Sequence, residues 1–137
     1  MMTEKAHQRE WQALQTQFDS YEKWSLLIKL THLITAALLI ATQLISLPIL
    51  AIGFGFWLQD GIWKTFQARI EHRLLQLEAH LAKKSQTVAF QFNREFSHRR
   101  GGTKQLLREY VGQSLKPTVA FPHALLLALY VLVLFVF

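Results

Sequence analysis

Three ionisable residues, Lys29, His32 and Asp60, stand within or beside long apolar stretches of the chain. Charged groups are costly in hydrocarbon, so within membrane segments they pair with one another or mark paths for ions and protons. If the chain folds back about Leu47, Asp60 reaches the depth of about Ile34. Its depth then differs from that of His32 by roughly 3 Å, at 1.5 Å per residue. The sequence thus predicts a membrane-embedded polar pair of Asp60 and His32, with Lys29 reaching past them to the inner surface. The alternative, favoured by the spare length of the apolar stretch, is that all three lie among lipid headgroups.

A further histidine, His123, lies near the start of the last apolar stretch, at an expected depth similar to that of His32. Two histidines on different helices at one depth is the arrangement that bis-histidine haem b requires. Histidines that bond to lipid or backbone are far commoner, so we expect no cofactor. His72 and His80 lack the i, i+4 spacing of paired metal ligands, and the chain has no cysteine, so we also expect no metal.

The densest basic cluster surrounds the glycine pair Gly101–Gly102, and we expect its side chains to contact anionic lipid headgroups: Arg99, Arg100, Lys104 and Arg108. A glycine turn before a helix could also hold a phosphate, but the chain has no Walker pattern or acidic set for magnesium. Three membrane spans already account for the net charge of +6, so we expect no nucleic-acid partner.

These residues require helices long enough to cross a membrane. Residues 118–137 contain no Asp, Glu, Lys or Arg, and about 20 helical residues cross a hydrocarbon core. Leu26 to Leu47 is a second apolar stretch long enough to span, interrupted only by Lys29, His32 and Gln43. The run from Leu47 to Leu58 is too short to cross alone and must continue to Lys64, so a re-entrant segment is the alternative to a full span. Pro122 should lie in the first turn of the last helix.

The expected fold is an all-α integral membrane protein with three transmembrane helices, a tight N-terminal hairpin and a C-terminal span, together with amphipathic cytoplasmic helices. The expected parts are an amphipathic N-terminal helix (1–24), a transmembrane hairpin (25–64), a basic cytoplasmic helical region (65–116) and a C-terminal transmembrane helix (117–137). Apolar spacings of three and four predict the amphipathic helices, including one that starts at Thr103 as N-cap and ends near Gly112. A helix through Val88, Phe92 and Phe96 is a further expectation, with a strand through Phe90 and Phe92 as the alternative.

Charge predicts the orientation. Residues 59–117 hold eleven Lys and Arg against five Asp and Glu, whereas the turn at 46–48 holds none. By the positive-inside rule the N-terminus and residues 65–116 are cytoplasmic and the C-terminus is periplasmic, in a bacterial inner membrane.

The expected function is that of a small accessory or scaffold subunit of a larger membrane complex, without catalysis. Its partners would be membrane lipids and another membrane protein or further copies of itself. The alternatives are an oligomeric pore or transporter subunit, lined by Thr35, Thr42 and Gln43, and a haem b electron-transfer subunit.

Overall fold

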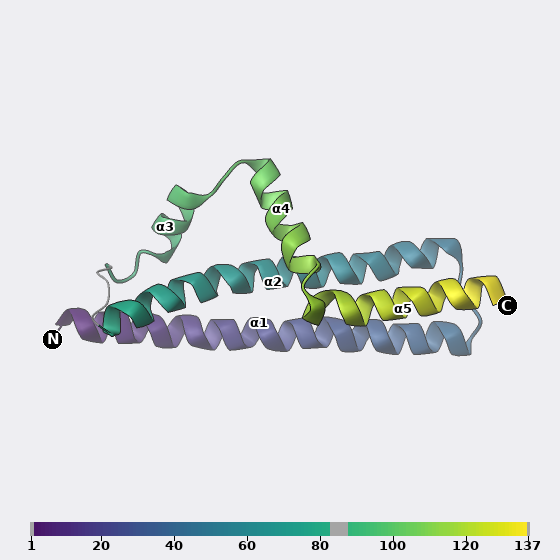
Figure 1. Cartoon of the computed structure of the whole chain (residues 1–137). Coiled ribbons are helices and arrows are strands. Elements are labelled where there is room, and N and C mark those ends of the chain that lie inside the picture. The colour runs from purple at the N-terminus through teal and green to yellow at the C-terminus, as the bar shows by residue number, and fades with distance from the viewer. Residues whose placement is uncertain (1, 83–87, 137) are drawn as a thin grey trace.

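The computed structural model describes residues 2–82 and 88–136, and all regular secondary structure within them is helical. Its helices are α1 (Met2–Ala41), α2 (Leu47–Leu81), α3 (Phe92–Arg99), α4 (Thr103–Ser114) and α5 (Pro117–Val136). Figure 1 shows α1 and α2 as a long antiparallel hairpin, with α5 alongside the half that contains the hairpin turn. The C-terminus therefore lies at the same end of the molecule as this turn, and the N-terminus lies at the other.

The hairpin consists of two unbroken helices. α1 runs for 40 residues, so the expected N-terminal amphipathic helix is not a separate element but the first half of α1. The turn occupies residues 42–46, where Gln43 has a φ of 53°, and Pro48 lies in the first turn of α2. Proline suits that position because the first amides of a helix have no intrahelical acceptor. α2 continues for 35 residues without a break, so within the fold it does not turn back as a re-entrant segment would.

The half of the hairpin farther from the turn is a two-helix stalk with its own apolar core. Leu14 of α1 packs among residues of α2 that recur at helical spacing, and aromatic side chains flank them. The core residues are Leu14, Ile70, Leu74 and Leu77, with Trp11, Phe18, Tyr21 and Phe92 around them. At the end of the stalk nearest the apolar half, Lys64 bonds to Glu22. This bond and one from Gln67 hold the pKa of the Glu22 carboxyl below its usual value.

α5 completes a three-helix bundle at the other half. Its Leu126, Leu127 and Tyr130 pack with Ala36 of α1, which is 1% exposed and small enough to let the helices approach. The helix starts at Pro117, so Pro122 lies inside it and not in its first turn as expected.

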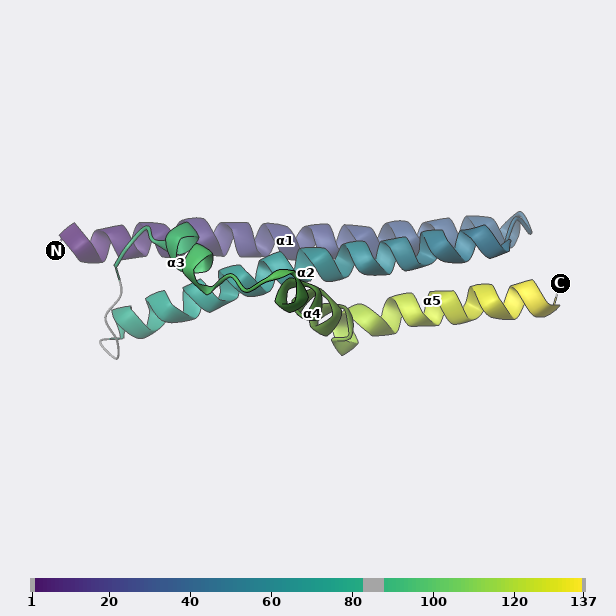
Figure 2. The same cartoon turned by 90° about the horizontal axis from the view of Figure 1, so that it is seen from above.

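α3 and α4 return the chain from the end of the stalk to the start of α5. Val88 precedes α3 and Phe90 has a φ of 58°, so the expected helix through Val88 begins only at Phe92. Gly102 caps α4 and Thr103 is its first residue, which corrects the expected cap. Figure 2 shows α4 nearly end-on, so it runs across the axis of the bundle.

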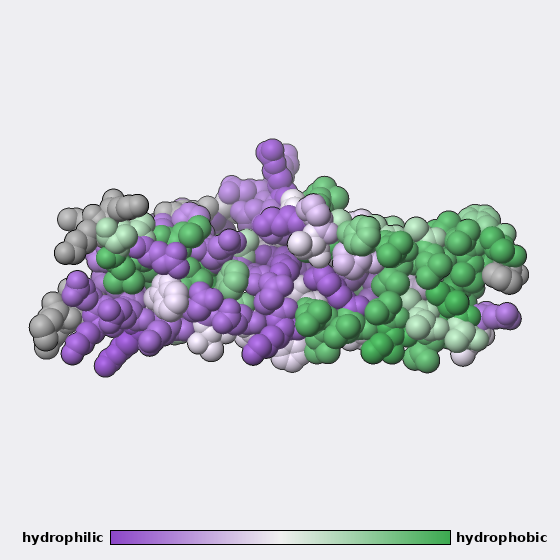
Figure 3. Space-filling view, turned by 60° about the horizontal axis from the view of Figure 1, so that its bottom comes forward, coloured by the Kyte–Doolittle hydropathy of each residue, from purple (hydrophilic) through white to green (hydrophobic). Residues whose placement is uncertain are grey.

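The surface divides into two halves. Figure 3 shows apolar side chains over the half that contains the hairpin turn and α5, and polar side chains over the stalk. Two helices, α1 and α5, are long and apolar enough to cross a membrane. These features agree with the expected all-α fold and with two of its three expected spans.

Candidate functional site

A cluster of polar side chains lies inside the apolar half, at its boundary with the stalk, where α1, α2 and α5 meet. Four of its members, on three different helices, are 0% exposed. The fifth, Lys29, keeps 18% of its side chain exposed. The five residues, which we call the polar cluster, are Ser25, Lys29, His32, Asp60 and His123.

Asp60 is the centre of the polar cluster. Its Oδ1 accepts a hydrogen bond from Ser25 Oγ at 2.5 Å, and its Oδ2 lies 2.7 Å from Lys29 Nζ and 3.2 Å from His123 Nε2. Lys29 also donates to Ser25 Oγ at 2.6 Å. The carboxylate thus has partners on both of its oxygens, which is the condition for burying a charge.

The structure brings Asp60, Lys29 and His32 together as expected, but with different direct partners. Lys29 does not reach past Asp60 but bonds to it directly, whereas His32 reaches Asp60 only through His123. Ser25 was not among the expected members. Its position four residues before Lys29, on the same helical face, was the available signal.

The two histidines meet directly. His32 Nδ1 lies 2.7 Å from His123 Nδ1, and the rings stack with centroids 5.0 Å apart. When His123 Nε2–H donates to Asp60, His123 Nδ1 is left as the acceptor for His32 Nδ1–H. His32 Nε2 then remains without a hydrogen-bond partner among the described residues, next to the stacked ring of Phe56. The polar cluster is thus a continuous chain of hydrogen bonds with one unpaired end.

This geometry does not fit haem b. Bis-histidine ligation places one imidazole on each face of the macrocycle, with the iron between two nitrogens. His32 and His123 instead bond to each other and share one stack, which leaves no space for a ring between them.

Close helix approach at the polar cluster depends on Gly53 of α2. A Cβ added there would lie 2.6 Å from Leu127 Cδ2, 3.1 Å from the Tyr130 ring and 3.4 Å from His32 Nε2. A Cβ at Gly55, two residues away, would meet nothing within 4 Å. The two glycines therefore form a matched pair for mutation.

We expect Gly53→Ala to be less stable than Gly55→Ala by about 1–3 kcal/mol, because overpacking a filled site costs roughly that much. Both changes gain the same helix propensity, about 1 kcal/mol, so their difference isolates the packing. Unfolding of the purified protein in detergent, followed by circular dichroism, measures it. Equal stabilities would mean that α5 does not pack against Gly53.

A second buried ionic group lies in the stalk, which the sequence interpretation missed. Arg73 of α2 is 2% exposed; its Nε donates to Glu10 of α1 at 2.8 Å, and its other nitrogens donate to Glu95 and to the carbonyl of Val88. The signal was present in the pattern, because Arg73 interrupts the apolar positions of α2 and Glu10 lies one turn before Leu14.

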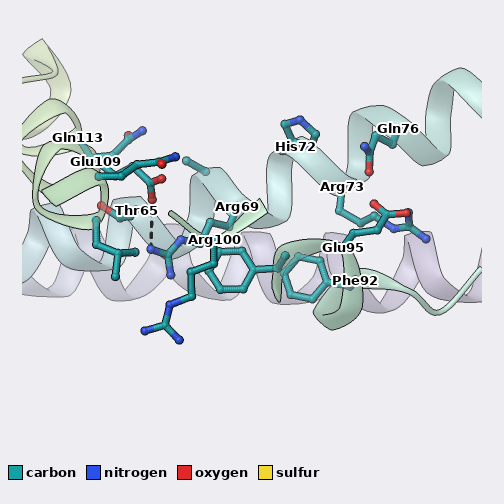
Figure 4. Close-up of a pocket in the computed structure, with 14 residues that line it drawn as sticks. Thr65, Arg69, His72, Arg73, Gln76, Phe92, Glu95, Arg100, Glu109 and Gln113 are labelled. Atoms are coloured by element: carbon teal, nitrogen blue, oxygen red, sulfur yellow. Dashed lines mark hydrogen bonds and ion pairs between the residues drawn. The ribbon is translucent and has the colours of Figure 1, made fainter. Parts of the chain in front are cut away.

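The structure also contains a pocket of about 280 Å³ between α2, α3 and α4. Figure 4 shows Arg69, Arg73, Glu95 and Glu109 around it. Arg69 pairs with Glu109 at 3.2 Å, and Arg73 pairs with Glu95 at 2.8 Å, so these pocket-lining charges neutralise each other.

Of the four expected headgroup-binding residues, Arg100, Lys104 and Arg108 are all exposed, and Arg100 also borders the pocket. The side chain of Arg99 lies outside the described part of the structure. Within that part, no three His, Asp or Glu side chains are placed so that they could hold a metal ion.

Comparison of the chain with protein-family models, with curated proteins and with solved structures found no match.

Proposed function

We propose that this protein is an integral membrane protein of three spans that acts as a non-catalytic accessory or scaffold subunit of a larger membrane complex. The supporting observation is the distribution of side chains in the apolar half. Leu26, Leu33 and Leu38 of α1 face outward with 56%, 51% and 61% exposure, whereas His32 and Asp60 are 0% exposed. A water-soluble bundle would reverse this arrangement, and a lipid environment favours it.

The third span in this proposal is α2. Figures 1 and 2 show it beside both α1 and α5 through the apolar half, and Ile52, Phe54 and Leu58 are 55–56% exposed. Asp60 lowers the apolarity of this helix, but its charge is paired inside the bundle and does not face lipid. An unbroken helix also satisfies its own backbone hydrogen bonds, as a spanning segment must.

Aromatic residues and charge support the orientation. Trp24, Trp57 and Trp63 lie near the level of Asp60, where an aromatic belt marks a membrane boundary. The basic excess lies on the stalk side, so we propose that the N-terminus and residues 65–116 are cytoplasmic and the C-terminus periplasmic, in a bacterial inner membrane.

A scaffold role is supported by the continuity of the hairpin. From Asp60 to Leu81, α2 extends about 30 Å beyond the boundary as a rigid stalk, at 1.5 Å per residue. The outward apolar faces of the spans offer docking surfaces for another membrane protein or a second copy of the chain. Purification in mild detergent, followed by identification of co-purifying proteins, tests this role; a protein that purifies alone and as a monomer would contradict it.

The topology gives a direct prediction. A reporter active only in the periplasm should be active when fused after Phe137 and silent when fused at Gly101, because the basic excess keeps the stalk side cytoplasmic. A cytoplasm-specific reporter at the same two positions should give the opposite pattern and serves as the control. Periplasmic activity at Gly101 would contradict the three-span arrangement.

The polar cluster favours a second candidate function, a proton-conducting pore or transporter subunit. Chains of Asp and His within membrane segments serve as proton relays, and the chain from Asp60 through His123 ends at the unpaired Nε2 of His32. A proton flux in vesicles that disappears in Asp60→Asn would select this function over the scaffold role.

A further inference from the structure

α4 leaves the bundle at the level of the proposed membrane boundary. Trp57 Nε1 donates to the Ser114 carbonyl at 2.8 Å, and a Cβ at Gly61 would lie 3.2 Å from Ser114 Cα, so the end of α4 packs closely against α2 beside Asp60. From this point α4 runs across the bundle axis, as Figures 1 and 2 show together. If the spans stand upright in the membrane, α4 therefore lies along its cytoplasmic surface.

One face of α4 is turned toward the stalk. Its pocket-lining residues are Gln105, Leu106, Glu109 and Gln113, and the other pocket walls come from α3 and from α2 beyond Asp60. Tyr110 is half-buried. Leu106 and Tyr110 are therefore less exposed than Leu107 and Val111, the other large apolar residues of this helix.

The opposite face of α4, continued by its C-cap Leu115, carries three exposed apolar residues at i, i+4 and i+8, which we call the α4 stripe: Leu107, Val111 and Leu115, with exposures of 57%, 57% and 63%. Val111 lies two residues from both Glu109 and Gln113, and two residues correspond to about 200° around a helix. Because Glu109 and Gln113 face the stalk, the α4 stripe on the opposite side of the helix faces the apolar half of the molecule.

Two basic residues border the α4 stripe. Lys104 lies three residues before Leu107 and Arg108 lies three before Val111, so both project from nearly the same side of the helix, and both are exposed. Long basic side chains can extend from an apolar face to the phosphate level. An apolar stripe bordered by lysine and arginine is typical of helices that lie in a membrane interface.

We propose that α4 is an interfacial helix that inserts the α4 stripe into the cytoplasmic leaflet and binds anionic phospholipid headgroups through Lys104 and Arg108. This inference depends on the proposed membrane insertion. It concerns the two expected lipid contacts that lie on α4 itself; Arg100, which is also exposed, precedes this helix.

The test uses the full-length protein, which has no native cysteine, reconstituted in vesicles. Single cysteines carrying an environment-sensitive fluorophore are placed at Val111→Cys in the α4 stripe, at Gln105→Cys on the pocket side, and at Leu38→Cys in the first span. Lipids with a quencher near the headgroup should quench the Val111 probe several-fold more than the Gln105 probe. A water-soluble quencher should show the reverse order.

Charge is tested by comparing phosphatidylcholine vesicles with vesicles that also contain phosphatidylglycerol. Lipid quenching at Val111 should increase with phosphatidylglycerol and fall in the double variant Lys104→Glu/Arg108→Glu, but not in the matched control Arg94→Glu on α3. Added salt should also weaken it, because salt screens exposed charges.

Three outcomes would overturn the inference. A Val111 probe that the aqueous quencher reaches better than the lipid quencher would place the α4 stripe in water, and a probe shielded from both would place it against protein. Equal quenching with and without phosphatidylglycerol would exclude anionic lipid as the ligand. The Leu38 probe separates these results from failure of the proposed function, because a lack of deep lipid quenching there would contradict membrane insertion itself.

Discussion

Replacing Arg73 by alanine should destabilise the stalk by about 3–5 kcal/mol, the usual cost of removing one partner of a buried ion pair. The guanidinium bonds to Glu10 through Nε at 2.8 Å and through a second nitrogen at 3.2 Å, so α1 and α2 are joined by a bidentate pair. Glu10 is 5% exposed. Without Arg73, the charge of Glu10 would remain buried, and its described partner would be the Phe90 amide, which donates to Glu10 Oε2 at 2.5 Å.

The loss should extend beyond the two long helices. Arg73 also donates to Glu95 of α3 and to the carbonyl of Val88, so the same side chain holds the segment that leads to α3 against the stalk. We therefore expect both a lower midpoint of unfolding in detergent and faster proteolysis within this segment.

A matched control is Arg69→Ala. Arg69 is also an arginine of α2 paired with a glutamate, but its partner Glu109 is 39% exposed, and such pairs contribute about 0–1 kcal/mol. Arg69 also lies over the rings of Phe66 and Phe96, and each such contact adds about 0.5–1 kcal/mol, so Arg69→Ala should still cost less than Arg73→Ala. The double variant Arg73→Met/Glu10→Leu should recover much of the loss, because no buried charge is left without a partner. If Arg73→Ala costs no more than Arg69→Ala, the ion pair is not buried in the protein in solution.

In this protein the sequence predicts the positions of the helices better than the side-chain contacts between them. Long apolar runs indicated the hairpin and the last helix, and spacings of three and four indicated the helical continuation of α2. The absence of proline and glycine before Pro48 also indicates that α1 can run unbroken. The separate N-terminal helix was expected only because hydropathy changes there, and a helix need not end where its surroundings change.

The membership of the polar cluster shows where residue counting fails. Counting along a helix gives the depth of a residue. Counting from the entry of each helix placed His32 and His123 at a similar depth, and the two side chains meet. Depth says nothing about the rotation of each helix about its axis, which decides whether Asp60 meets Lys29 or His32. That rotation depends on close packing at Gly53 and Ala36, which three helices determine together.

Asp60→Ala should destabilise the detergent-solubilised protein by about 3 kcal/mol, because it removes the shared acceptor of Ser25, Lys29 and His123. Lys29 would then keep its charge with Ser25 Oγ as its described partner. Glu22→Ala is the matched control, since it removes a carboxylate whose side chain is 61% exposed and is expected to cost about 0–1 kcal/mol.

Double-mutant cycles distinguish the partners of Asp60. Combining Asp60→Ala with Lys29→Met should recover a large part of the loss, because the pair in direct contact is removed together. Combining it with His32→Ala should give a smaller coupling energy, since His32 bonds to His123 and not to Asp60. A larger coupling with His32 than with Lys29 would restore the pairing expected from depth alone. Additive effects in both cycles would instead mean that Asp60, Lys29 and His32 act as separate headgroup-level residues and that the three helices are held together by apolar packing.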